Sequence, residues 1–168
     1  MLIPPPRVTI PSGSTASQLF SFQIPANTRS GEYVIQVETL GGDDLLEMTV
    51  RVLPSYSIAV EWIEPPDIVR AGGNIKARYL LQNTGNADVE LELEARSSLG
   101  YGVSMSRSAL LLGAGETKEV SLQVQTLDNI MSRQTHSVVV DVFRSGADGD
   151  LTSLRQISFI SEIIPVQQ

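Results

Sequence analysis

A partial internal repeat constrains the fold of this 168-residue sequence more than any other feature. When VTIPSGSTASQLFSFQI (residues 8–24) is shifted by 102 positions, it lies over LLLGAGETKEVSLQVQT (110–126). The shift superimposes Gly13 on Gly115, Thr15 on Thr117, Phe20 on Leu122 and Phe22 on Val124. A shift of 105 lays residues 33–37 over residues 138–142. The end of one unit therefore occurs again as the end of a second.

Alternation of polar and apolar residues predicts β-strands throughout. The clearest case is VELELEA (89–95), in which Val and Leu alternate with Glu, as in a strand with one face on a core and one in water. Turn residues such as PSGST, PANTRSG and GGDD separate the strands. The predicted strands are residues 7–10, 17–24, 32–39, 45–53, 56–63, 74–82, 87–96, 101–105, 109–112, 117–125, 137–144 and 151–160.

The repeat also predicts where the units divide. Each copy has a Gly/Asp turn (GGDD at 41–44, GADGD at 146–150) and then a strand that runs to a proline, Pro54 or Pro165. A period of about 100 residues with about seven short strands is the size of an immunoglobulin-like sandwich. We therefore expect an all-β fold: a complete immunoglobulin-like antiparallel β-sandwich at 55–168, preceded at 1–54 by the C-terminal half of another, about four strands long.

A half-sandwich leaves an apolar face and strand edges open to water. Three sources of cover are open: strands upstream in a longer protein, a second chain, or the complete unit itself. We favour the first. The exposed edges also allow a dimer. Residues 1–10 show no signal peptide, but a fragment from inside a longer chain looks the same.

Composition narrows the classes of partner. The net charge of −7 argues against nucleic acid, and no apolar run reaches the length of a membrane helix, so we expect no membrane insertion. The chain has no cysteine, which excludes disulfides and thiolate metal sites. We predict no cofactor and no metal site.

A family resemblance rests on YLLQNTGNADVELELEA (79–95) and LGAGETKEVSLQV (112–124). These segments resemble the cell-adhesion-related domain found in bacteria and similar immunoglobulin-like modules appended to glycosidases and surface proteins. The resemblance implies a non-catalytic spacer or adhesion module of a larger bacterial surface or secreted protein, extracellular or in the cell envelope. It also implies partners among neighbouring domains of the parent chain, with a protein or glycan as external ligand. It supplies no functional residues to transfer.

Two aromatic residues are the candidate ligand contacts. Trp62 lies just past the junction at Pro54, and Tyr101 lies in a Gly-flanked loop. Either ring could stack on a sugar, which defines the alternative function, a carbohydrate-binding accessory module of a secreted enzyme. For Trp62 we favour packing in the core or between domains.

No catalytic residues are predicted. His136 is the only histidine, and neighbouring strand residues such as Ser137 point to the opposite face, so no triad is indicated. Glu90, Glu92 and Glu94 share one solvated face, whereas glycosidases need carboxylates facing each other across a sugar. GAGETK (113–118) departs from the spacing of a phosphate-binding loop, and we interpret it as a β-turn.

Two further loops have simple structural interpretations. Asn83–Asn86 predicts a tight turn with positive φ between two antiparallel strands. The carboxylates of Asp43, Asp44, Asp148 and Asp150 lie in equivalent hairpins, where calcium is conceivable, but two carboxylates per loop fall short of the six or more oxygens that calcium needs. Asp and Gly are also preferred turn residues.

Overall fold

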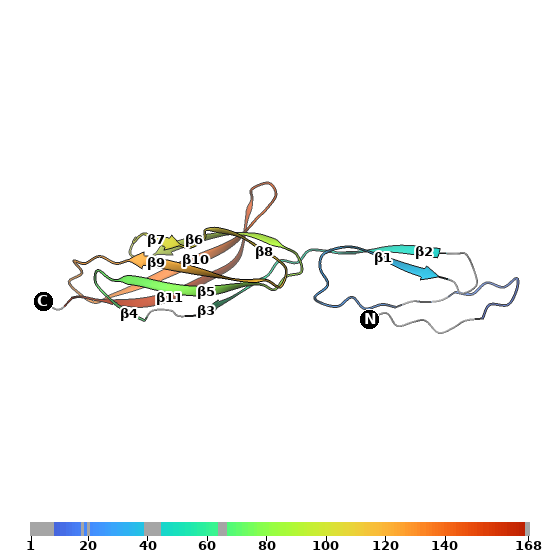
Figure 1. Cartoon of the computed structure of the whole chain (residues 1–168), viewed down its shortest axis with the longest axis horizontal. Coiled ribbons are helices and arrows are strands. Elements are labelled where there is room, and N and C mark those ends of the chain that lie inside the picture. The colour runs from blue at the N-terminus through green and yellow to red at the C-terminus, as the bar shows by residue number, and fades with distance from the viewer. Residues whose placement is uncertain (1–8, 18, 20, 39–44, 64–66, 167–168) are drawn as a thin grey trace.

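A computed structural model describes residues 9–17, 19, 21–38, 45–63 and 67–166 of the chain. The described residues form eleven β-strands and no helix. Figure 1 shows two parts along the long axis of the molecule: a sandwich that contains β3 to β11, and an N-terminal part that contains β1 and β2. The predicted all-β fold class is confirmed.

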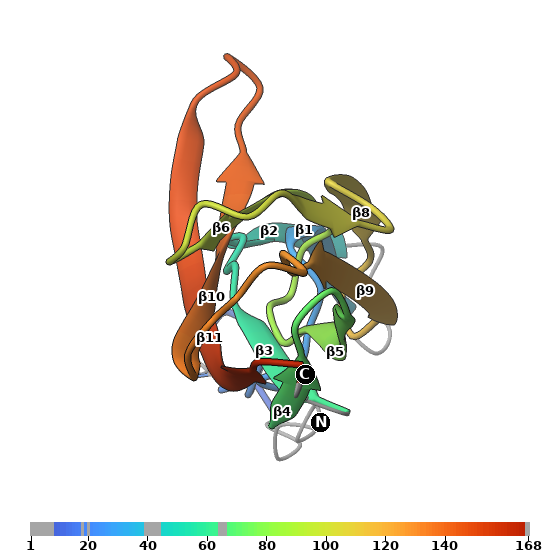
Figure 2. The same cartoon turned by 90° about the vertical axis from the view of Figure 1, so that its left-hand side faces the viewer.

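The sandwich consists of two sheets (Figure 2). One has the order β4 (Ile68–Arg70), β11 (Leu151–Ile164), β10 (Gln134–Ser145), β6 (Val89–Ser97) and β8 (Ala109–Leu112). The other has the order β3 (Ile58–Trp62), β5 (Asn74–Asn83), β9 (Thr117–Gln125) and β7 (Val103–Met105). Neighbouring strands are antiparallel except β11 and β4, which are parallel. This is the immunoglobulin-like arrangement that the repeat length predicts.

The core lies between the two sheets and consists mainly of aliphatic side chains. In β6, Val89, Leu91 and Leu93 are buried, while Glu90 and Glu94 face solvent. The same alternation in β5 and β10 places Tyr79 and Val140 in the core without solvent exposure. The alternation of apolar and polar residues therefore places one face of each of these strands in the core, as the sequence predicts.

The short strand β4 was not predicted from the sequence. Its three residues, 68–70, pair in parallel with 162–164 at the end of β11. The preceding strand, β3, belongs to the opposite sheet, so the chain changes sheets between Trp62 and Ile68. Because this pairing joins segments almost a hundred residues apart, local alternation gives no sign of it.

The N-terminal part contains fewer strands than expected. The hairpin of β1 (Gly31–Glu38) and β2 (Leu45–Val52) is present, with Tyr33 opposite Val50. The predictions of strands at 7–10 and 17–24 were wrong for the described residues there, which show only an isolated bridge at Phe22. A strand needs a hydrogen-bonded neighbour for its backbone, and none of the described strands pairs with these segments.

Candidate functional site

The best-defined polar contact region is the junction where the N-terminal part joins the sandwich. Asn86 lies in the loop between β5 and β6, and its backbone and side chain both bind the linker. The Ser55 amide donates to Oδ1 of Asn86 at 2.6 Å, and the Asn86 amide donates to the Ser55 carbonyl at 3.0 Å. Nδ2 of Asn86 donates to the Leu53 carbonyl at 3.1 Å. Both backbone polar groups of Ser55 are thus bonded to Asn86, one to its side chain and one to its backbone.

Further contacts extend this junction on both sides. The Thr84 amide donates to the Ser57 carbonyl, and the Ser30 amide of the N-terminal part donates to the Asn86 carbonyl, both at 2.9 Å. The Arg144 guanidinium, at the base of the β10–β11 hairpin, lies 4.4 Å from the centre of the Tyr56 ring, a cation–π contact. Residues just before and after Pro54 therefore both contact the sandwich.

Asn83 gives the β5–β6 loop its shape. Its side chain is fully buried; Nδ2 donates to the carbonyls of Ala87 (2.8 Å) and Leu112 (3.1 Å), and Oδ1 accepts from the Gly85 amide (2.9 Å). These bonds satisfy backbone groups that the loop would otherwise bury without partners. The loop conformation is therefore specified from inside the sandwich.

The expectation of a tight turn with positive φ at Asn83–Asn86 was wrong in two respects. The loop connects β5 and β6, which lie in different sheets, so it is not a hairpin turn. None of its residues has positive φ. Gly85 is required for a different reason: an added Cβ would lie 2.1 Å from the Ser55 carbonyl oxygen and 3.1 Å from the Ser57 nitrogen. Only glycine lets the linker backbone approach the loop this closely.

A polar cleft of about 540 Å³ lies along this junction. One wall comes from residues 26, 27 and 29 of the N-terminal part and the other from the loops at 82–86 and 114–115. Asp88, beside the cleft, accepts from the Ala114 amide at 2.9 Å and pairs with Arg29 at 3.2 Å. Both partners of this ion pair are more than half exposed, so the pair contributes little stability.

Trp62, one of the two predicted contact residues, packs against the core. Its ring meets Tyr79 edge-on at 5.3 Å and 68° and Phe159 at 5.0 Å and 76°. Tyr79 and Phe159 belong to opposite sheets, so Trp62 closes one side of the sandwich between them. Such edge-to-face pairs add stability beyond burial. The geometry favours the packing interpretation over a sugar platform.

Since Trp62 is the only tryptophan, its fluorescence tests that interpretation directly. We expect the emission maximum and intensity to stay unchanged when neutral or acidic oligosaccharides are added at millimolar concentration. A saturable quench or shift would show that a sugar reaches the ring and would contradict the packing interpretation.

Tyr101, the second predicted contact residue, stacks on His136 with ring centres 5.5 Å apart and an angle of 23°. Its hydroxyl donates to Gln134 at 3.4 Å, and its amide donates to Oγ of Ser97 at 3.1 Å. The ring is half-buried. The structure does not bring Tyr101 together with Trp62, which packs against other rings, so no paired aromatic platform is formed.

His136 is fully buried, which no local sequence signal indicated. Nε2 lies 2.8 Å from Oγ of Ser97, and Nδ1 has no hydrogen-bond partner among the described residues. Burial lowers the pKa of His136 below its ordinary value of 6.5. On the other face of β10, Asp141 accepts from Gln156 at 2.6 Å and pairs with Arg96 at 2.5 Å. His136 and Asp141 therefore lie on opposite faces of β10.

The lowered pKa of His136 predicts a loss of stability in mild acid. Between pH 6.5 and the lower pKa of the folded state, the unfolded chain binds more protons, so the free energy of unfolding falls as pH falls. The slope from one proton is at most about 1.4 kcal/mol per pH unit. Urea unfolding at pH 7.5, 6.5 and 5.5 measures it. The His136→Gln variant, which cannot titrate, should lose most of this dependence; an unchanged slope would contradict the assignment.

The remaining loops considered as binding sites form turns or are exposed to solvent. In the segment 113–118, residues 113–116 form the predicted β-turn between β8 and β9, with φ of 79° at Gly115 and a 2.9 Å bond from the Glu116 amide to the Gly113 carbonyl, and residues 117–118 begin β9. Asp148 and Asp150 lie at the exposed tip of the β10–β11 hairpin. Asp43 and Asp44 lie outside the described residues. Within the part of the chain that the structure describes, no cluster of three metal-ligating side chains occurs.

Comparisons with known proteins find similar folds, but they assign no activity to this chain. No protein-family model and no curated protein sequence matches this chain. Escherichia coli α-2-macroglobulin, from domain MG7 to its C-terminus, aligns with a TM-score of 0.51 at 11% identity, over 66% of this chain and 17% of that one. A family 123 glycoside hydrolase from Clostridium perfringens aligns with a TM-score of 0.50 at 5% identity, over 67% of this chain and 27% of the enzyme.

A CARDB domain from Pyrococcus furiosus is also among the similar structures, with a TM-score of 0.45 at 14% identity, over 66% of this chain and 89% of that domain. The immunoglobulin-like fold itself is confirmed by the order and pairing of the strands in the two sheets. At these identities the likeness concerns the fold alone. The fold assigns no activity by itself, since it matches part of a hydrolase as well as other immunoglobulin-like modules.

Proposed function

We propose that this chain is a non-catalytic structural segment of a larger modular protein, in which it sets the spacing and orientation of successive immunoglobulin-like units. This proposal rests on the ordered junction between the N-terminal part and the sandwich. Five hydrogen bonds, described above, hold residues 30 and 53–57 against the loop that contains Asn86 and Thr84, and two of them, to Leu53 and from Ser30, join the N-terminal part to the sandwich. A linker that only tethered two domains would need none of them.

The backbone character of these contacts supports a mechanical role. Ser55 uses its amide and carbonyl, and Gly85 is placed so that the linker backbone lies against it. Directed backbone pairs restrict rotation as well as distance, so the two parts are expected to reorient together. Such a passive spacer needs no polar pocket with perturbed ionisable groups, whereas an enzyme does.

The proposal is tested by nuclear magnetic resonance relaxation of the backbone amides. A coupled pair of units tumbles as one elongated body, so β1–β2 and the sandwich should give the same overall correlation time. If the β1–β2 amides tumble several times faster than those of β5 and β9, the linker is flexible and the spacer role fails.

We also propose that the parent protein lies in the cell envelope or outside the cell, by analogy with modules of the resembling family. Within the described residues, no helix is long and apolar enough to cross a membrane. Immunoblotting of fractionated source cells tests the location. Signal in the envelope or the medium supports it, and signal confined to the cytoplasm contradicts it.

A further inference from the structure

The β1–β2 hairpin has one apolar face, which we call the open face. Its members alternate along both strands and share one side because antiparallel partners point the same way. The opposite side is mostly polar, with Gln36 donating to Glu47 at 2.7 Å. The open face consists of Tyr33, Ile35, Val37, Leu46, Met48, Val50 and Val52.

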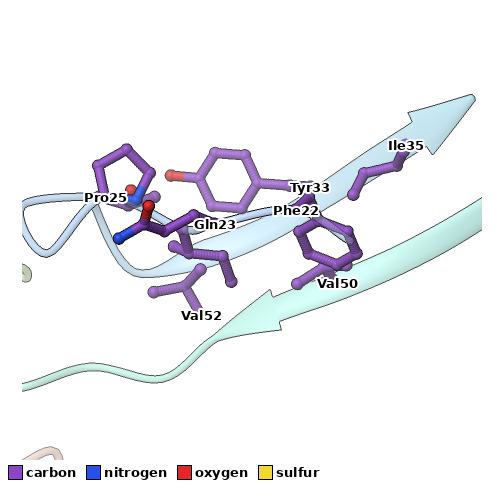
Figure 3. A pocket seen from close by; sticks show the side chains of 9 residues that line it. Phe22, Gln23, Pro25, Tyr33, Ile35, Val50 and Val52 are labelled. Carbon is purple, nitrogen blue, oxygen red and sulfur yellow. The ribbon is translucent and has the colours of Figure 1, made fainter. Parts of the chain in front are cut away.

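The open face remains accessible to water in this chain. Leu46 is 63% exposed, Met48 42% and Tyr33 40%. At one end of it, Phe22 and Ile24 border a groove of about 180 Å³ together with Tyr33, Val50 and Val52, and Figure 3 shows the Phe22 ring next to Val50. Large contiguous apolar surfaces are rare on soluble monomers and mark contact surfaces.

In the complete sandwich, the hairpin of β10 and β11 corresponds to β1 and β2, and there the opposing sheet covers its apolar face. The shift of 105 places Tyr33 and Ile35 on Val138 and Val140 of β10. Their partners across the ladder are Val50 and Met48 in the N-terminal hairpin and Phe159 and Ile157 in the complete unit. Both hairpins therefore pair apolar residues at these positions, and β10 and β11 also have a bulge between Val142 and Phe143. In the complete unit, Val138 and Val140 are fully buried and Phe159 is 6% exposed. The part of the open face around Tyr33, Ile35 and Val50 is thus the counterpart of a core face.

The counterpart also shows which strands are needed. In the complete unit, β10 pairs along its outer edge with β6, and the opposing sheet of β3, β5 and β9 covers the hairpin's inner face. In the N-terminal part, residues 17–24 correspond to β9, while β1 pairs with β2 alone among the described strands. Counterparts of β3, β5 and β6 would therefore complete the unit.

We propose that the open face and the outer edge of β1 bind strands supplied by residues that precede this segment in the same polypeptide. The strand beside β1 runs antiparallel to it, as β6 runs to β10, and turns an alternating apolar row such as Val-x-Leu-x-Leu onto the open face. The order of strands in the repeat supports this assignment. In the complete unit, β3, β5 and β6 all come before residue 109, which is the counterpart of residue 7.

A second copy of this chain fits the surface less well. Pairing β1 edge to edge with another β1 extends the sheet but leaves both open faces in water. Packing two open faces together leaves the edges of β1 unpaired. The strands of the missing layer satisfy both requirements at once. This assignment does not depend on the spacer role, because a binding module would need the same covering.

The test uses the protein from its source, captured with an antibody raised against the sandwich. Mass spectrometry should find a polypeptide with at least about 50 residues before this segment, the length of the counterpart at 55–108. Hydrogen exchange of peptides covering β1 should be at least about tenfold slower in that polypeptide than in the 168-residue chain. The 168-residue chain should be monomeric in light scattering.

Matched substitutions in the longer polypeptide then locate the contact. Ile35→Glu, on the open face, should abolish the slow exchange of β1, whereas Val34→Glu, on the opposite side and 59% exposed, should preserve it. A native product that begins at residue 1, a longer product with unchanged exchange, or equal effects of the two variants would overturn the proposal. A dimeric 168-residue chain with protected β1 amides would replace it with self-association.

Discussion

Replacing Asn83 by alanine is expected to lower the free energy of unfolding of the sandwich by about 3 kcal/mol, because three buried hydrogen bonds are lost together. The side chain satisfies the Ala87 and Leu112 carbonyls and the Gly85 amide, and it has no solvent exposure. Each buried polar group left without a partner costs about 1 to 3 kcal/mol. Urea unfolding followed by far-ultraviolet circular dichroism measures the change.

Gln82→Ala provides the matched control for Asn83→Ala. Gln82 is the preceding residue of β5, has an exposed side chain, and is expected to change stability by less than about 0.5 kcal/mol. The Gln82 side chain points away from the core. The Gln82→Ala variant therefore measures the change in stability caused by truncating a side chain at this end of β5 when the Asn83 hydrogen bonds stay intact. Equal effects of the two substitutions would show that the Asn83 bonds do not specify the loop.

Gly85→Ala is expected to open the junction. The new Cβ would meet the Ser55 carbonyl oxygen at 2.1 Å, and both it and the neighbouring Ser57 nitrogen are backbone atoms that cannot rotate away. The linker must therefore move, which breaks the pair between Ser55 and Asn86. We expect the Ser55 and Asn86 amides to exchange with solvent at least about tenfold faster, while amides in the centre of β9 are unaffected.

Gly102→Ala is the control for this variant, since an added Cβ there meets no atom within 4 Å and φ is not positive. It should leave the Ser55 and Asn86 amides as in the wild type. If Gly85→Ala also leaves them unchanged, the close approach of linker and loop is not what holds the junction.

The sequence predicts strands well where burial alternates along a single segment. VELELEA and TKEVSLQVQ appear as β6 and β9 because each has an apolar face and a polar face. It predicts poorly where a strand depends on a distant partner. Residues 68–70 form β4 only because the end of β11 lies beside them, and the described residues of 17–24 form no strand because none of the described strands pairs with them.

The junction shows the same limit for the candidate site. Asn83–Asn86 has the composition of a hairpin turn, and that composition predicts positive φ. The loop instead crosses between sheets, and its glycine serves a close contact with a segment thirty residues earlier. Likewise, nothing near His136 in the sequence indicates its contact with Ser97, thirty-nine residues away. Non-local contacts decide both cases.

A distance distribution across the junction tests the spacer account most directly. The chain lacks cysteine, so Thr49→Cys in β2 and Lys76→Cys in β5, both exposed, can carry two spin labels without interference. Pulsed electron paramagnetic resonance should give a single narrow distribution for this pair, which broadens when Gly85→Ala is added. A distribution that is already broad, and that Gly85→Ala leaves unchanged, would contradict an ordered junction.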